Sequence, residues 1–211
     1  MRPGSRELLL FLCLAGSALA ASRQHSIVLG RWQAAKVPLA GDEQTVKVRA
    51  LIIDGRLREY TSGPLHEVTD QLFVIRKVVR INDSLPQEGV PARWVWRLGG
   101  WISIDRATGH IAQLNLPAFD PDASQASWYQ DYAAYCGGSE DGSKTFLVVW
   151  QLGKRKPILR KEYSGTICAS PTWDRGPARV SFNLAGEKAS FVVHAHAAEP
   201  QPESAEEEGP Q

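Results

Sequence analysis

Active-site motifs are missing from this 211-residue sequence. It contains no G-x-S-x-G nucleophile motif, no H-E-x-x-H metalloprotease motif and no glycine-rich phosphate loop. It also has no C-x-x-C pair, the spacing that redox and zinc sites commonly use. The sequence therefore favours a protein that has no catalytic residues and needs no cofactor, although it does not settle whether the protein is an enzyme.

A strong charge of one sign is also missing, because 24 Lys and Arg residues face 23 Asp and Glu residues, for a formal net charge of +1. Charges this balanced and this widely spread do not indicate a nucleic-acid-binding protein. After residue 20, no apolar run is long enough to form a transmembrane helix. We therefore expect neither nucleic acid as a partner nor a transmembrane segment in the mature chain.

The first twenty residues have the pattern of a secretory signal peptide. Arg2 and Arg6 precede an apolar run at residues 8–15, which is too short to span a bilayer. Residues 18–20 (ALA) supply the small side chains that signal peptidase requires, so cleavage is expected after Ala20. This pattern predicts a secreted or periplasmic protein.

The other end of the chain, residues 199–211, reads EPQPESAEEEGPQ, with five glutamates, three prolines and no basic residue. Such a segment cannot bury enough apolar surface to offset the entropy lost on ordering, so a disordered acidic tail is predicted. The remaining residues, 21–198, are enough for a single β-rich domain with a substantial core.

Cysteine is scarce, with three in the chain, and Cys13 would leave with the signal peptide. The remaining pair, Cys136 and Cys168, predicts one disulfide in an oxidising compartment. Apolar residues in the segment 124–136 fall on one face of a helix, and Gly137 follows as a cap. Cys136 is then expected at the helix C-terminus, where the helix dipole disfavours a reactive thiolate.

Elsewhere, polar and apolar residues alternate with period two, which is typical of β-strands. Turn sequences such as Asp54-Gly55 separate these segments and predict hairpins. Residues 146–152 are apolar on both faces, which predicts a central strand. The expected fold is mainly β, an antiparallel sandwich or a strongly bent sheet of about nine strands, hairpin-rich, with one α-helix near residues 124–136.

Three of the seven tryptophans, Trp94, Trp96 and Trp101, lie close together in a predicted strand. Trp94 and Trp96 share a face because they are two residues apart. If the indoles are exposed, they would form a platform for a glycan or another small molecule. The alternative is that this face belongs to the core and the neighbouring arginines face water.

His194 and His196 form the second candidate site. On a strand, residues two apart point to the same face, so both imidazoles could bind one Zn²⁺ or Cu²⁺ ion. A third ligand would have to come from His25, His66, His110 or a carboxylate brought near by folding. The alternative is two exposed histidines with no site. The basic run at residues 154–161 (KRKPILRK) predicts a solvated hairpin turn, which leaves weak contact with an anion or the cell envelope open.

These features favour a secreted or periplasmic, non-catalytic β-rich domain that binds an envelope component or has a structural role. The first alternative is a glycan-binding or small-molecule-binding module that uses the tryptophans. The second is a metal-dependent enzyme or a metal carrier built on His194 and His196.

Overall fold

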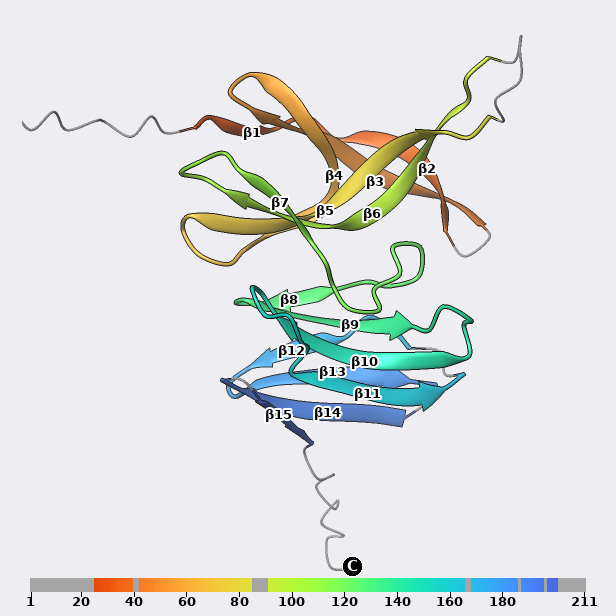
Figure 1. Cartoon of the computed structure of the whole chain (residues 1–211), viewed down its shortest axis with the longest axis vertical. Helices are drawn as coiled ribbons and strands as arrows, with labels where there is room; N and C mark the ends of the chain where they lie inside the picture. Colours follow the sequence, from red (N-terminus) through yellow and green to blue (C-terminus); the bar gives the residue numbers. More distant parts are fainter. Residues whose placement is uncertain are drawn as a thin grey trace, which may run out of the picture.

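The computed structural model describes residues 25–39, 42–84, 91–165, 168–185, 187–195 and 197–200. These residues form three antiparallel sheets that are stacked along the long axis of the molecule (Figure 1). A seven-stranded sheet, here called sheet A, lies at one end, followed by two four-stranded sheets, sheet B and sheet C. The predicted fold class is confirmed, since the chain is mainly β, antiparallel and rich in hairpins.

Sheet A is strongly bent. Its strands are β1 (Ile27–Leu29), β2 (Gln33–Leu39), β3 (Asp42–Ile53), β4 (Arg56–Glu67), β5 (Leu72–Asn82), β6 (Trp94–Asp105) and β7 (Ile111–Leu114). They are ordered β1-β3-β4-β5-β6-β7, and β2 pairs with the same edge of β3 as β1 does. The register shifts in the β3–β4, β4–β5 and β5–β6 ladders, and such irregularities bend a sheet.

The strands of sheet A carry two separate apolar clusters. One contains buried Leu51, Ile53, Phe73, Ile75, Ile102 and Ile104, and the other contains Ala35, Val37, Val48, Val78 and Leu98. Because all of these residues come from the same sheet, sheet A builds a core by curling around its own side chains. The curl does not close into a barrel.

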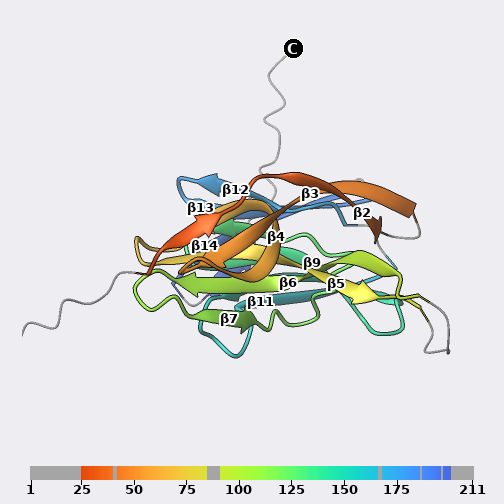
Figure 2. The ribbon, with the colours of Figure 1, turned by 90° about the horizontal axis from the view of Figure 1, so that it is seen from above.

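Sheets B and C form the rest of the molecule. Sheet B contains β8 (Ser127–Tyr129), β9 (Tyr132–Gly138), β10 (Lys144–Gln151) and β11 (Leu159–Ser164), in the order β11-β10-β9-β8. Sheet C contains β12 (Thr172–Arg175), β13 (Ala178–Leu184), β14 (Glu187–His194) and β15 (Ala197–Pro200), in chain order. Seen from above, strands of the different layers run in broadly similar directions, as expected for aligned face-to-face packing (Figure 2).

Strand β10 is buried on both faces, which confirms the prediction of a central strand. Phe146, Val148 and Trp150 share an apolar cluster with Val74 and Trp101 of sheet A. Leu147 and Val149 belong instead to a cluster with Val180 and Phe182 of sheet C. Sheet B is therefore the middle layer, and its alternating side chains contribute to two cores.

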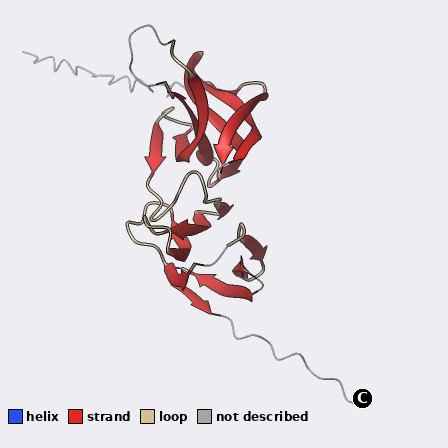
Figure 3. Cartoon of the chain, turned by 90° about the vertical axis from the view of Figure 1, so that its right-hand side faces the viewer, coloured by secondary structure: helices blue, strands red, loops and turns tan. Residues whose placement is uncertain are grey.

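The helix predicted near residues 124–136 is wrong. The segment contains β8, a turn at Gln130 and Asp131, and β9, and the described part of the chain has no helix (Figure 3). Apolar residues occupy both faces of β9, because Tyr132 and Ala134 pack in the core with sheet C while Ala133 and Tyr135 pack in the core with sheet A. A strand that is buried on both faces does not alternate between polar and apolar residues. Here the apolar positions matched the spacing expected of an amphipathic helix.

Gly137 therefore does not cap a helix. A Cβ atom at this position would clash with the carbonyl oxygen of Ala118. The loop that contains Ala118 is tied across β9, since the hydroxyl of Tyr135 donates to Pro117 O (2.8 Å) and Gly138 N–H donates to Ala118 O (3.1 Å). Gly137 is needed for this close approach of two backbone segments.

The expected end segments fall largely outside the described residues. The predicted signal peptide, residues 1–20, lies entirely outside them. Of the predicted tail, residues 201–211 lie outside, while Glu199 and Pro200 belong to β15 and pair with Val192 and Phe191. Within the described ranges, no helix is long and apolar enough to cross a bilayer.

Candidate functional site

The main recess that contains a sequence-predicted residue is a groove of about 600 Å³ between β2 and the first half of β6, here called the seam groove. Both strands belong to sheet A, and the groove runs where the bent sheet fails to close. It is lined by residues of β2, of the start of β3 and of both sides of the β5–β6 connection: Ala34, Ala35, Lys36, Pro38, Asp42, Glu43, Asp83, Arg93, Trp94, Val95, Trp96 and Arg97.

The hydrogen-bonding pattern explains why the groove is open. β2 pairs with β3 along one edge, and among the described residues no strand pairs with its other edge. Residues 94–98 of β6 pair with β5, and β7 begins to pair only at Trp101. Within the described ranges, the groove is therefore bordered by two strand edges that have no ladder partner.

The structure brings Trp94 and Trp96 to the same groove. Trp94 is 55% exposed, which is unusual for so large an apolar side chain. Trp96 is half-buried against the Val78 cluster, and its ring contacts that of Tyr60 edge-on at 4.9 Å between centroids. Trp96 is thus held in place by the core, while Trp94 stands at the mouth of the groove.

Trp101 lies elsewhere. In the β5–β6 ladder it pairs with Arg76, beyond the register shift that separates it from Trp94 and Trp96. There it is 8% exposed in the core between sheets A and B, with its ring 5.4 Å from that of Trp128. Of the three predicted tryptophans, two line the groove and one belongs to the core.

Charged side chains of both signs line the groove. Lys36 Nζ lies 2.8 Å from Glu43 Oε2, and this hydrogen bond raises the pKa of the ammonium group. Arg93 forms an ion pair with Asp83, and the hydrogen bond lowers the pKa of that carboxyl group. The walls therefore offer charged donors and charged acceptors beside the indoles.

Sequence reasoning missed the β2 wall of the groove. The sequence of β2, QAAKVPL, contains proline and two alanines and does not show the alternation that marks a strand. Lys36 and Glu43 face each other only because β2 and β3 form a hairpin, with Lys36 paired to Thr45 in the ladder. A period-two search alone could not have found this wall.

The histidine pair remains a prediction. His194 is the last residue of β14 and is exposed, the chain turns at Ala195, and His196 lies outside the described residues. The same-face argument needed a strand that continues through residue 196. In the described part of the chain, no three His, Cys, Asp or Glu side chains are grouped so that they could hold a metal ion.

Two of the other histidines lie in or beside sheet A. His25 Nδ1 lies 2.6 Å from Asp54 Oδ2. His66 Nε2 lies 2.7 Å from Gln130 O, and because that carbonyl can only accept, this nitrogen carries the proton. His66 also stacks on Trp128 of sheet B. His66 of sheet A therefore contacts sheet B. His194 belongs to sheet C, a different layer.

Cys136 and Cys168 form a disulfide, as predicted, with their Cα atoms 6.1 Å apart. Cys136 belongs to β9 of sheet B, and Cys168 forms a β-bridge with Leu184 of sheet C. The bond therefore links two stacked sheets beside the core that they share.

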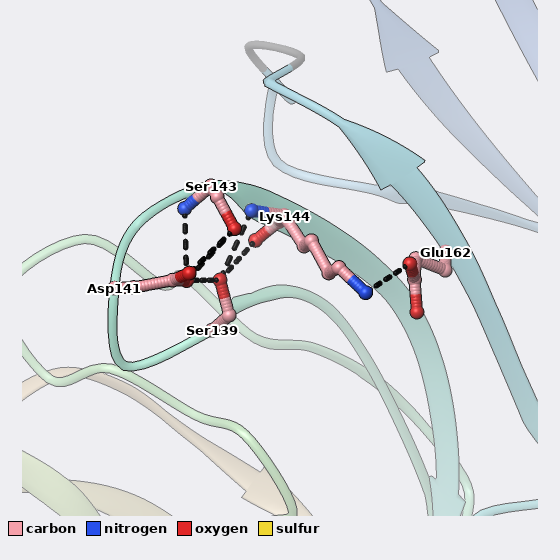
Figure 4. A network of polar contacts seen from close by, with 5 residues as sticks. All are labelled: Ser139, Asp141, Ser143, Lys144 and Glu162. Carbon is pink, nitrogen blue, oxygen red and sulfur yellow. Dashed lines mark hydrogen bonds and ion pairs between the residues drawn. The ribbon is translucent and has the colours of Figure 1, made fainter.

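A network of polar side chains at the largely exposed β9–β10 turn serves the turn itself (Figure 4). Ser139 Oγ and Ser143 N–H donate to Asp141 Oδ1 at 2.5 and 3.1 Å, and Ser143 Oγ donates to Oδ2 at 2.8 Å. Hydrogen bonds from Ser139 and Ser143 lower the pKa of Asp141 to about 2. Nearby, Lys144 forms an ion pair with Glu162 across the β10–β11 ladder.

The chain matches no protein-family model, no curated protein and no solved structure in the comparisons made with each. What the protein binds must be inferred from its own residues.

Proposed function

We propose that this protein is a secreted or periplasmic, non-catalytic binding module that holds a glycan of the cell envelope in the seam groove. The observation that carries the proposal is Trp94, which is 55% exposed at the mouth of a groove of about 600 Å³. That volume is within the range of about 300–1,000 Å³ that is usual for small-molecule sites. An indole that is exposed to water lowers the solubility of a protein and lacks packing contacts. Its position beside a recess therefore supports a role in binding.

The chemistry of the groove suits a carbohydrate. A sugar ring has an apolar face of C–H groups that can pack on an indole, and its rim of hydroxyl groups both donates and accepts hydrogen bonds. Trp94 and Trp96 supply the apolar surface, and the charged pairs Lys36–Glu43 and Arg93–Asp83 supply strong donors and acceptors. Because three cations of the lining, Lys36, Arg93 and Arg97, are balanced by three acids, Asp42, Glu43 and Asp83, the groove favours a neutral glycan over a highly charged one.

Two observations support the proposed location. The pattern of residues 1–20 is that of a signal peptide. The Cys136–Cys168 disulfide is of the kind that persists in oxidising compartments such as the periplasm or the extracellular space.

Tryptophan fluorescence, measured while soluble peptidoglycan fragments and neutral oligosaccharides are added to the purified chain, tests the proposal. We expect saturable quenching, and we expect Trp94→Ala to weaken binding by roughly tenfold or more, equivalent to about 1.4 kcal/mol. The matched control is Trp32→Ala, because Trp32 is similarly exposed at 44% but does not line the groove. Equal affinity in the wild type and Trp94→Ala, or no binding of any glycan, would contradict the proposal.

A further inference from the structure

A second recess lies where the edge strand β7 of sheet A meets the β10–β11 turn of sheet B. It measures about 500 Å³, and its lining is mostly apolar, with Leu72 and Leu114 from sheet A, Trp150 from β10 and Leu152 from the β10–β11 turn. Lys154 and Arg155 of the turn stand at its rim. This recess, here called the turn pocket, shares no lining residue with the seam groove.

The turn that forms the rim is held by hydrogen bonds to its base. The indole N–H of Trp150 donates to Lys154 O at 2.7 Å, and Lys154 N–H donates to Gln151 O at 3.0 Å. Leu152 N–H donates to Asp131 O at 2.8 Å, which joins the turn to the β8–β9 hairpin. Gly153 has a φ of 79°, which few other residues could adopt. The backbone under the two cations is therefore fixed relative to the apolar lining.

The cations at the rim have no acidic partner in the part of the chain that the structure describes. Lys154, Arg155 and the following Lys156 are exposed, and the ion pairs of the described residues all involve other side chains. In the seam groove, by contrast, Lys36 and Arg93 are both paired with acids. Unpaired positive charge next to an apolar lining is complementary to a ligand with an anionic head and an apolar body.

We propose that the turn pocket binds a single-chain anionic amphiphile, a long-chain carboxylate, with its alkyl chain against Leu72, Leu114 and Leu152 and its carboxylate at Lys154 and Arg155. The site is independent of the seam groove, and the proposal does not rest on glycan binding. The basic turn, predicted from the sequence as a solvated hairpin, would then have a specific class of ligand.

Isothermal titration of the purified chain with decanoate and with decanol of the same chain length tests the proposal. Decanoate should bind about tenfold more tightly than decanol, because charge-assisted hydrogen bonds are stronger than neutral ones. The double variant Lys154→Gln and Arg155→Gln keeps most of the aliphatic stems and should abolish that preference. The matched control, Arg56→Gln with Arg58→Gln, removes two exposed cations of β4 and should keep it.

A pocket-filling variant locates the alkyl chain. Asn115 lines the turn pocket from an exposed loop position, so Asn115→Trp should block it and abolish binding of both probes, while a thermal melt checks that the variant is folded. The proposal is wrong if decanoate does not bind, if it binds no better than decanol, or if Asn115→Trp leaves binding unchanged. Binding to phosphatidylglycerol vesicles that needs Lys154 and Arg155 but tolerates Asn115→Trp would also overturn it, because the turn would then only contact a membrane surface.

Discussion

Sheet A and the pair formed by sheets B and C bury their apolar residues in different ways. Sheet A packs side chains of its own strands into two apolar clusters, and three irregularities in its ladders bend it. Sheets B and C pack two separate faces together and are joined by the Cys136–Cys168 bond. The difference shows where a binding surface can arise. A curled sheet that does not close leaves an open seam, whereas apolar side chains fill the core between the two disulfide-linked sheets.

The two regions are not independent, because sheet B also packs on sheet A. Tyr135 is fully buried in this shared core, and its hydroxyl donates to Pro117 O at 2.8 Å. Burial also raises the pKa of the Tyr135 phenol, so it stays protonated and able to donate at any ordinary pH.

The largest effect should come from breaking this shared core. Tyr135→Ala should lower the free energy of unfolding by about 3–5 kcal/mol, as large-to-small core substitutions do. Tyr135→Phe, which removes only the hydroxyl, should cost about 1 kcal/mol. Urea denaturation followed by fluorescence and by far-ultraviolet circular dichroism should show one coincident transition for the wild type. Two separate transitions would mean that sheet A and the B–C sandwich unfold independently.

Removing the Cys136–Cys168 disulfide should have the next largest effect on stability. The two cysteines are 32 residues apart. For a loop of this size, the chain-entropy model predicts that the double variant Cys136→Ser with Cys168→Ser lowers the free energy of unfolding by about 3–4 kcal/mol. Reduction of the wild type should reproduce the loss in urea denaturation. A chain that is equally stable before and after reduction would show that the packed core between sheets B and C suffices without the bond.

The close approach of the Ala118 loop to β9 predicts a smaller effect. Gly137→Ala should cost about 1–3 kcal/mol, since its Cβ would clash with Ala118 O and the loop would have to move. The neighbouring Gly138→Ala is a matched control, because a Cβ there meets no atom within 4 Å, and thermal denaturation should separate the two. Similar melting temperatures for both variants would show that the loop moves aside freely.

The smallest effect concerns the exposed turn at Asp141. Its pKa falls from the usual 3.8 to about 2 in the folded chain, so its hydrogen bonds stabilise the fold above about pH 4. This contribution should be lost as the pH falls through about 2, and Asp141→Asn should be less stable than the wild type at pH 6 but not below pH 2. An NMR titration of the Asp141 carboxyl checks the shift directly. A midpoint near 4 would show that the serines do not hold the carboxylate in solution.

Sequence alone predicted the parts of the fold that depend on local pattern. Asp54-Gly55 does form a hairpin turn between β3 and β4, and the two-faced apolar run of β10 does lie in the centre of the molecule. The isolated cysteine pair was sufficient to predict the disulfide. In each case the signal lies within a few residues or within a simple count.

The parts that failed depend on contacts between distant segments. The apolar residues of β9 were assigned to a helix because a second layer, invisible in the sequence, covers the other face of the strand. The seam groove was half predicted, since Trp94 and Trp96 were identified while the β2 wall was not. Whether two neighbouring tryptophans are buried or exposed depends on how far a sheet curls, and no local pattern records that curl.

The positions of β1 and β15 have a mechanical consequence. They are the first and last described strands, each lies at the edge of its sheet, and they contain three and four residues. They belong to the two outer layers of the stack (Figure 1). A pull on the two ends of the described chain would therefore load a few edge hydrogen bonds first, and these would peel away one after another. If the chain were tethered and stretched, its ends should yield at low force and lengthen, while the two-faced middle layer and its covalent link to sheet C would still be intact.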